Sequence, residues 1–229
     1  MMNRLFLAVC FYFGTALALA SPEIVDKPII YNAERAELMR SYLVAHNGAE
    51  QPEDPMVATT MEPKVVVLHW TAVGSLQGSF NAFNHVRIRS ARSISKAGAV
   101  NVSVQFLVDR DGTIYRLMDE TRMGRHTIGL NHLAIGVENV GGGAKWPLTQ
   151  AQVNANADLI RDLTKRHGIT HVIGHHEYRL MEKHPYFQEL DPNYRTRKSD
   201  PGPEFMNQVR ALIQDLKLEG PPPKKPSAE

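Results

Sequence analysis

Cysteine is nearly absent from this chain of 229 residues, which contains only Cys10. Cys10 lies in an apolar run at the N-terminus, so a chain cleaved behind that run would have no thiol. Disulfides would then be excluded, and the fold would depend on its hydrophobic core or on a bound metal. A metal site in that part of the chain could use only His, Asp and Glu, because no thiolate is available.

An excess of charge of one sign is also missing, since 26 Lys and Arg residues stand against 24 Asp and Glu residues. Proteins that bind nucleic acid usually carry a clustered basic face. The near-neutral balance therefore predicts no nucleic-acid partner. The remaining composition, 43% hydrophobic and 22% charged, is that of an ordinary globular protein, and the length is sufficient for one domain with a sizeable core.

The one long apolar run is at the N-terminus, at residues 5–20, and follows a short start in which Arg4 is the only cation. This run has about 16 residues, whereas a membrane-spanning helix needs about 20. It ends in Ala-Leu-Ala before Ser21, the small-x-small pattern of a cleavage site. We therefore expect residues 1–20 to be a signal peptide and the protein to be exported, periplasmic or secreted. No stable membrane insertion is expected after cleavage, and an uncleaved anchor is the alternative.

Apolar periodicity and turn residues predict alternating helices and strands in the rest of the chain. We expect helices at residues 33–47, 75–92, 149–167 and 203–218, and strands at 64–70, 102–108, 113–118, 133–140 and 171–174. Thr149 and Gln152 form a capping box for the third helix, and Gly168 ends it. The sequence Asp-Arg-Asp-Gly between the second and third strands is typical of a hairpin.

This mixture of helices and strands predicts the fold class and the division of the chain. We expect an α/β fold with a single domain, in which a mixed central β-sheet is flanked by helices. The expected segments are an N-terminal extension with one helix at 21–61, the main domain at 62–218 and a tail rich in Pro and Lys at 219–229.

Two histidines and one aspartate stand where a metal site could form. His69 ends a run of four aliphatic residues, where a neutral polar ring is costly unless something binds it. His175 ends the short strand at 171–174, and Asp200 lies on a turn fixed by Pro and Gly. Two imidazoles and one carboxylate from three segments suit a catalytic zinc site, with the fourth position left to water. Strand alternation favours His175 over its neighbour His176, which should point the other way.

The other histidines have simpler interpretations. His46, His167 and His184 lie at predicted helix ends or in loops and are expected at the surface. His85 lies on a predicted helix that must pack one face, and it is expected to have a packing role. His132 lies in a loop, and its position in the sequence does not decide whether it approaches a cleft.

Six segments carry a resemblance to a known family. They are Val-Val-Leu-His-Trp-Thr (66–71), Val-Asp-Arg-Asp-Gly-Thr-Ile-Tyr (108–115), Arg-His-Thr-Ile-Gly-Leu-Asn (125–131), Ile-Gly-Val-Glu-Asn (135–139), Ile-Gly-His (173–175) and Lys-Ser-Asp-Pro-Gly-Pro (198–203). In kind and order they resemble the motifs of zinc-dependent N-acetylmuramoyl-L-alanine amidases of type 2, relatives of phage lysozyme-type amidases and of peptidoglycan recognition proteins. The resemblance covers roughly residues 62–215.

The resemblance implies a function and a set of site residues. The substrate would be peptidoglycan or its muropeptides, cut at the amide bond between N-acetylmuramic acid and L-alanine. The implied zinc ligands are His69, His175 and Asp200. The implied catalytic groups are Glu138 and Lys198, and the implied substrate contacts are His126 and Asn131. Amide hydrolysis needs an activated water, a stabilised oxyanion and a proton for the leaving nitrogen. A carboxylate at a strand end and a lysine two residues before a ligand suit these tasks.

The chain departs from the family pattern in two places. Some relatives have a catalytic tyrosine at the place that falls near Val104 here, which puts more weight on Glu138. The 24 residues between His175 and Asp200 are more than compact relatives have. Residues 177–197 hold Tyr178, Tyr186, Phe187 and Tyr194, so we expect this segment to form a wall of the substrate groove; the alternative is that its aromatic side chains pack on the protein itself.

Two other functions compete with the amidase. The first is a peptidoglycan-binding module without catalysis, although such relatives typically lose a metal ligand and this chain keeps all three. The second is a zinc peptidase of another fold, which is disfavoured because the helical His-Glu-x-x-His motif is absent from the sequence.

Overall fold

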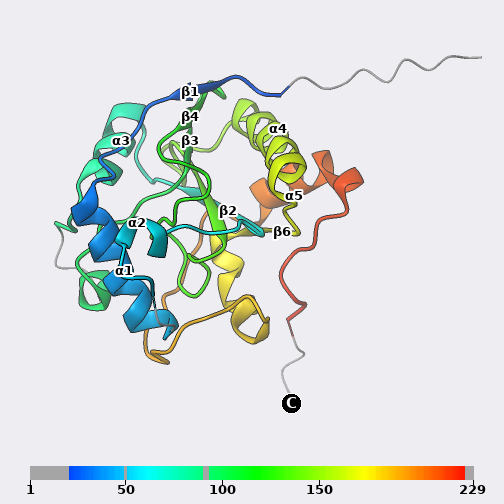
Figure 1. Cartoon of the computed structure of the whole chain (residues 1–229). Helices are drawn as coiled ribbons and strands as arrows, with labels where there is room; N and C mark the ends of the chain where they lie inside the picture. Colours follow the sequence, from blue (N-terminus) through cyan, green and yellow to red (C-terminus); the bar gives the residue numbers. More distant parts are fainter. Residues whose placement is uncertain (1–20, 49–50, 90–92, 225–229) are drawn as a thin grey trace, which may run out of the picture.

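The structure is a computed structural model that describes residues 21–48, 51–89 and 93–224 (Figure 1). The expected signal peptide at 1–20 lies outside the described residues. Among the helices that are described, none has both the length and the apolar character needed to span a bilayer.

A six-stranded mixed sheet forms the centre of the fold, with strand order β1-β4-β3-β5-β2-β6. The strands are β1 (Ile24–Asp26), β2 (Val65–Trp70), β3 (Phe106–Val108), β4 (Ile114–Arg116), β5 (Ala134–Asn139) and β6 (His171–Gly174). Only β3 and β4 pair antiparallel, which confirms the expected hairpin, and the other neighbours run parallel. Because β2, β5 and β6 are parallel neighbours, their carboxyl ends meet at one edge of the sheet.

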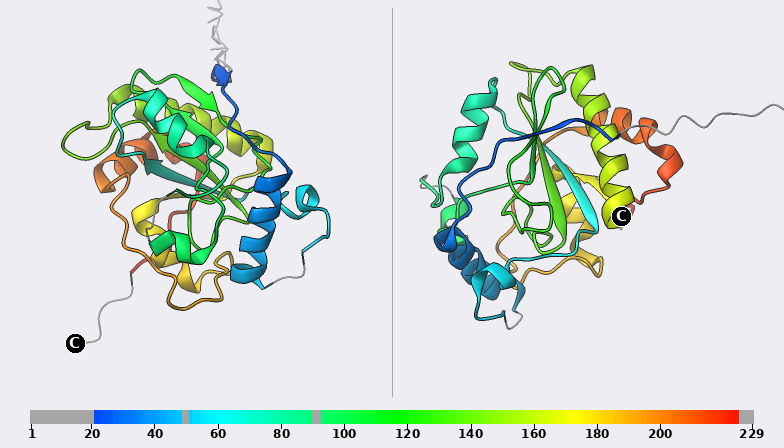
Figure 2. Two further views of the ribbon diagram at one scale, coloured as in Figure 1. Left: turned by 90° about the vertical axis from the view of Figure 1, so that its left-hand side faces the viewer. Right: turned by 45° about the horizontal axis from the view of Figure 1, so that its top comes forward.

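Helices cover both faces of this sheet, as Figure 2 shows. The α-helices are α1 (Ala33–Asn47), α2 (Pro55–Ala58), α3 (Leu76–Asn84), α4 (Gln150–His167) and α5 (Pro203–Leu212), and the 3-10 helices are η1 (Ser93–Ala97), η2 (His175–Lys183) and η3 (Gln214–Leu216). On one face, Val66 and Leu68 of β2 lie in one buried cluster with residues of α4 and α5. On the other, Val65 and Val67 pack with Tyr178 and neighbouring loops. The α/β fold with a mixed sheet and flanking helices is therefore confirmed.

Local signals in the sequence account for the two long helices. The side chain of Asn32 caps α1 at its start, and Gly48 ends it in the left-handed conformation. The predicted capping box of Thr149 and Gln152 is present in α4, and Gly168 follows with a φ of 65°. The N-terminal extension at 21–61 also contributes the edge strand β1 and the four-residue helix α2.

Two helices are shorter than the periodicity predicts. The helix expected at 75–92 ends at Asn84, and residues 90–92 lie outside the described part. At this end, one guanidinium nitrogen of the buried Arg35 lies within hydrogen-bonding distance of the carbonyl oxygens of Phe83, Asn84 and His85. These carbonyls would otherwise lack partners at a helix end. The helix expected at 203–218 ends at Leu212 and is followed by η3.

His46 is buried, which corrects the expectation that it lies at the surface. Its Nδ1 lies 2.8 Å from a carboxylate oxygen of Glu189, and its Nε2 lies 2.8 Å from the carbonyl oxygen of Ala97. A carboxylate and a carbonyl oxygen can only accept, so the arrangement is satisfied when both ring nitrogens carry hydrogen, which stabilises the imidazolium form. Burial would lower the pKa of His46, but these hydrogen bonds outweigh it and raise the pKa. The pair joins α1 to the segment at 177–197.

We expect His46→Gln to destabilise the protein mainly at acidic and neutral pH. A raised pKa means that the contribution of His46 is fully present below its unfolded pKa of about 6.5 and is lost as the pH rises through the folded value. The expected loss is about 1–3 kcal/mol at pH 5.5, the scale of hydrogen bonds to charged groups. Urea unfolding of both proteins at pH 5.5 and 8.5 measures it. A difference that is equal at both pH values would contradict the assignment.

Candidate functional site

The candidate site lies where β6, β2 and β5 end side by side. His69 of β2 is the register partner of Glu138 of β5, and Leu68 of β2 is the partner of Gly174, the residue before His175. Register partners in a parallel sheet project from the same face. His69, His175 and Glu138 therefore come to one level at the carboxyl edge of the sheet.

Asp200 completes a cluster with the two histidines. His69 Nδ1 and His175 Nδ1 are 2.9 Å apart. Asp200 Oδ2 lies 3.0 Å from His175 Nδ1 and 3.3 Å from His69 Nδ1. Among the described residues this is the one group of His, Cys, Asp or Glu whose atoms converge in the manner of a metal site.

The cluster fits a zinc ion by its donor atoms and their spacing. Ligand atoms about 2.0–2.2 Å from a tetrahedral zinc lie about 3.3–3.6 Å from one another, and the three separations here, of 2.9, 3.0 and 3.3 Å, come close to this. Two imidazoles and one carboxylate are also the donor set of several catalytic zinc sites, which leave a position for water. His69, His175 and Asp200 could thus hold a metal ion.

Burial and neighbouring groups shift the pKa values of the three side chains toward the protonation states that metal binding requires. Burial, followed by the proximity of His175, lowers the pKa of His69 to about 4, and burial also lowers the pKa of His175. Both rings are therefore neutral at pH 7, as a metal ligand must be. Burial would raise the pKa of Asp200, but the hydrogen bond with His175 holds it well below its usual range.

His176 does not join the cluster, although it is adjacent to His175. Its backbone N–H donates to the carbonyl oxygen of Asp200 at 2.8 Å, and its Nδ1 lies 3.1 Å from the same oxygen. The ring folds back against Gly174, where an added Cβ would come within 2.7 Å of it. His176 therefore holds the backbone of Asp200, a role that the sequence did not indicate.

Glu138 faces the cluster with an unpaired oxygen. Its Oε2 is buried and has no hydrogen-bond partner among the residues that the structure describes. Burial and repulsion by Asp200 raise the pKa of Glu138 well above its ordinary value, and the opposing attraction of Lys198 is smaller. A carboxylate with a raised pKa is a stronger base, which suits proton transfer near neutral pH. Val104, at the place of the tyrosine of some relatives, is fully buried.

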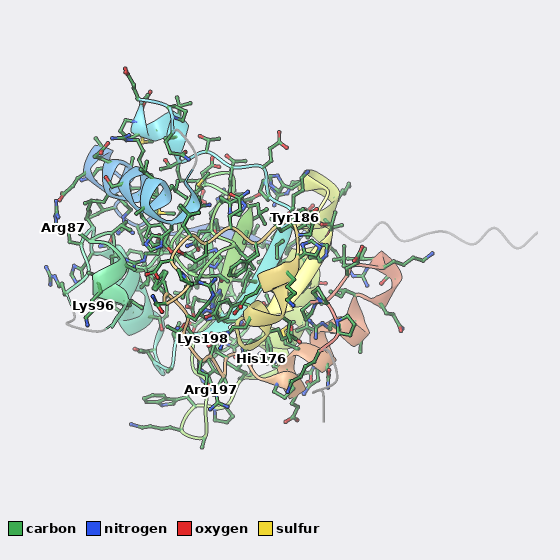
Figure 3. All side chains as sticks on the ribbon, turned by 90° about the horizontal axis from the view of Figure 1, so that it is seen from below. Arg87, Lys96, His176, Tyr186, Arg197 and Lys198 are labelled. Carbon is green, nitrogen blue, oxygen red and sulfur yellow. The ribbon has the colours of Figure 1, made fainter. Side chains whose placement is uncertain are left out.

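Lys198 reaches the same site from the segment that precedes Asp200. It is half-buried and interacts electrostatically with Glu138, His69 and His175. Figure 3 labels Lys198 beside His176 and the exposed Arg197. The five residues that the resemblance assigns to the metal and to catalysis thus gather at one edge of the sheet.

The two expected substrate contacts, Asn131 and His126, lie next to the cluster on the side of His69. Asn131 is buried, and its side-chain oxygen accepts hydrogen bonds from the backbone N–H groups of His126 and Thr127, at 2.9 and 2.8 Å. The His126 ring is half-buried, with Nδ1 3.1 Å from His69 Nε2. Asn131 thus fixes the loop that brings His126 to His69.

A small cavity of about 60 Å³ adjoins the cluster. Its walls include His175 and Lys198 as well as Tyr42 of α1 and Tyr194 of the segment at 177–197. The N-terminal extension therefore helps to form the surroundings of the site, which the sequence did not indicate because no local pattern marks a long-range contact.

The aromatic residues of the segment at 177–197 mostly pack on the protein itself. Tyr178 is buried and donates a hydrogen bond to the carbonyl oxygen of Thr196. Tyr186 and Phe187 pack against the buried cluster around Val65 and Val67. Of the four aromatic residues, only Tyr194 lines the cavity beside the cluster. Only this end of the segment therefore agrees with the expectation of a groove wall.

Comparisons with known proteins give the family of the chain and its fold. The family model described as N-acetylmuramoyl-L-alanine amidase matches residues 59–203, more than half of the chain. A solved structure of the N-acetylmuramoyl-L-alanine amidase LysC from Clostridium intestinale URNW has a TM-score of 0.50 at 19% identity and covers 86% of this chain and 99% of its own. A structure of AmpD has a TM-score of 0.50 at 21% identity and covers 83% of this chain and 94% of its own. At such identities the two structures show the fold alone.

A curated relative matches a shorter part of the chain. Peptidoglycan recognition protein 3 of Mus musculus is 29% identical over 97 residues, which are 42% of this chain. The match spans only 28% of the mouse protein. The likeness therefore concerns one part of a longer relative.

Proposed function

The chain belongs to the N-acetylmuramoyl-L-alanine amidase family, and we propose that it is an exported zinc hydrolase that cuts the amide bond between N-acetylmuramic acid and L-alanine in peptidoglycan. The observation that carries this proposal is the convergence of three metal-ligating side chains, a buried carboxyl group with an unpaired oxygen and a lysine at one edge of the sheet. The three ligands would be His69, His175 and Asp200.

The remaining residues supply the proton transfers and the charge that amide hydrolysis needs. Zinc, when bound, would polarise the scissile carbonyl and lower the pKa of a water to about 7. Glu138 would take a proton from the attacking water through its unpaired Oε2 and pass it to the leaving nitrogen of L-alanine. Lys198 would donate a hydrogen bond to the substrate oxygen on which negative charge develops. His176 would keep Asp200 in place by binding its carbonyl oxygen.

A second candidate function is recognition of peptidoglycan without catalysis. The likeness to mouse peptidoglycan recognition protein 3 favours it. The presence of all three ligands together with Glu138 and Lys198 favours the hydrolase, since binding alone requires neither an unpaired carboxylate nor a metal.

We expect the zinc-loaded chain from Ser21 onward to release free peptides that begin with L-alanine from purified peptidoglycan. Mass spectrometry of the soluble products identifies them. Lys198→Ala should slow this release about a hundredfold, the usual effect of losing one oxyanion donor. Arg197→Ala, which removes the adjacent exposed cation, is the matched control and should release peptide at the normal rate. Sedimentation of the protein with peptidoglycan without any released peptide would instead establish the recognition function.

Export is supported by the apolar run at residues 5–20 and its small-x-small end. The N-terminal residue of the protein recovered from the producing cells tests it. Ser21 at the N-terminus agrees with signal cleavage, and Met1 on membrane-bound protein would indicate an anchor.

A further inference from the structure

The ring of His126 has a closely fitted position beside the candidate metal ligands. It lies against the backbone of Gly136 in β5, where an added Cβ would come within 2.9 Å of the ring and 2.8 Å of Val104. Only glycine leaves room for the ring at this place. Asn131 holds the backbone N–H of His126 from the other side, at 2.9 Å. The ring is therefore held by neighbours on two elements.

The partners of His126 determine which of its nitrogens carries hydrogen. Nε2 lies 3.1 Å from the carbonyl oxygen of Ala134, which can only accept a hydrogen bond, so Nε2 must be the donor. The other partners of the ring, the hydroxyl of Thr127 and Nε2 of His69, carry no negative charge that would stabilise an imidazolium, so the ring is neutral. A neutral imidazole that carries hydrogen on Nε2 has a free lone pair on Nδ1. Nδ1 of His126 is therefore an acceptor.

This acceptor faces the far nitrogen of His69. His69 Nε2 lies 3.1 Å from His126 Nδ1 and 3.4 Å from the hydroxyl oxygen of Thr127. The hydroxyl lies 2.9 Å from His126 Nδ1, so it can donate there and still accept from His69. If His69 carried its hydrogen on Nδ1 instead, two lone pairs would oppose each other across 3.1 Å. On the opposite side of the ring, His175 Nδ1 lies 3.0 Å from Asp200 Oδ2, which can only accept, so His175 Nδ1 carries hydrogen and faces His69 Nδ1 at 2.9 Å. Both sides thus favour hydrogen on Nε2 of His69 and a free lone pair on Nδ1.

We propose that His126 is a positioning residue that fixes the tautomer of His69, so that the Nδ1 lone pair of His69 is ready for a divalent cation before the cation binds. A chain of two hydrogen bonds runs from His69 through His126 to the backbone carbonyl of Ala134 and ends on an atom that cannot change its role. The proposal rests on the metal site of the proposed function, and it gives His126 a task other than contact with substrate. Outer partners of this kind usually affect metal affinity 10–100-fold.

The tautomer itself can be observed without a metal or a substrate. Long-range ¹H–¹⁵N NMR spectra of the metal-free chain at pH 7 distinguish the two ring nitrogens of each histidine. We expect His69 to carry hydrogen on Nε2 in the wild-type protein and to show a mixture of tautomers in His126→Ala. Hydrogen on Nδ1 of His69 in the wild-type protein, or an unchanged tautomer in a folded His126→Ala, would overturn the proposal.

Zinc affinity, measured by competition with a chelator, is the second readout. His126→Ala should weaken binding 10–100-fold. His126→Asn places an amide oxygen near the position of Nδ1, keeps the acceptor, and should restore affinity to within about threefold of wild type. Thr127→Val removes the competing hydroxyl at nearly constant shape and should leave affinity unchanged. Equal affinities in the Ala and Asn variants would overturn the proposal. If the wild-type chain bound no zinc, the proposed function would fail, while the NMR result would still decide the tautomer.

Discussion

Replacing His175 by alanine is expected to remove zinc and with it all measurable amide hydrolysis. His175 Nδ1 lies within 3.0 Å of both other ligand atoms, and loss of it leaves a pair that cannot complete the coordination. Residues that only hydrogen-bond to a metal ligand already change metal affinity 10–100-fold when they are replaced. The loss of a direct ligand should therefore weaken zinc binding more than about a hundredfold. Metal analysis after gel filtration and chelator competition measure it.

His176→Ala is the matched control, because it removes an imidazole one position along the same chain. The variant keeps the backbone hydrogen bond to the carbonyl oxygen of Asp200 and loses only the one from the ring. We expect the variant to retain zinc with less than about a tenfold change in affinity. This is a smaller effect than that of most residues that hydrogen-bond to a metal ligand. Loss of zinc in His176→Ala with retention in His175→Ala would show that the ligand assignment is wrong.

The pH dependence of zinc binding follows from the same burial. Protons compete with the metal only when they can bind the ligand nitrogens. The pKa of His69 is lowered to about 4, and that of His175 is lowered as well. The competing protonation of His69 therefore becomes important only as the pH falls toward 4. We expect the decline in affinity to begin at a lower pH than the decline below about 6.5 that exposed histidines would give. Equilibrium dialysis at stepwise pH tests this expectation.

The proximity of His69 and His175 could be predicted because both residues stand in strong local patterns. His69 ends a run of buried aliphatic residues, and His175 follows a short strand, so both fall at strand ends whatever the details of the fold. Parallel pairing then brings those ends together. The capping box of Thr149 and the hairpin of β3 and β4 were predictable for the same reason, since each depends on residues only a few positions apart.

Features that depend on distant parts of the chain could not be predicted in this way. The carbonyl oxygen of Asn84 at the end of α3 is bound by Arg35, which lies 49 positions earlier. The burial of His46 depends on Glu189, 143 positions away. The hydrogen bond between His69 and His126 joins residues 57 positions apart, and its chemical consequence follows from the partner of His126 rather than from any motif.

Glu138→Gln is expected to reduce kcat by at least about a hundredfold while zinc stays bound, because the amide cannot accept the proton of the attacking water. In the wild-type protein, activity should rise with pH as Glu138 loses its proton, and this rise should be absent from whatever activity the variant retains. Glu182→Gln, a change of the same kind at the opposite end of η2 from His175, is the matched control and should keep both the rate and the pH profile. Normal kcat in Glu138→Gln would rule out the assignment of Glu138 as the base.

The same substitution should make the metal-free protein more stable at pH 7. The folded pKa of Glu138 lies well above its unfolded value of 4.5, so ionisation in the folded state is costly at every pH above the unfolded value. A neutral side chain of the same shape avoids this cost, and we expect a gain of about 1–2 kcal/mol in the free energy of unfolding. Near pH 4 the carboxyl group is largely protonated in both states, so the gain should nearly vanish. Urea unfolding of wild type and Glu138→Gln at pH 7 and pH 4 measures this difference. If Glu138 is a catalytic base, its replacement should raise stability and abolish turnover. If Glu138 had a structural role, its replacement would lower both stability and activity.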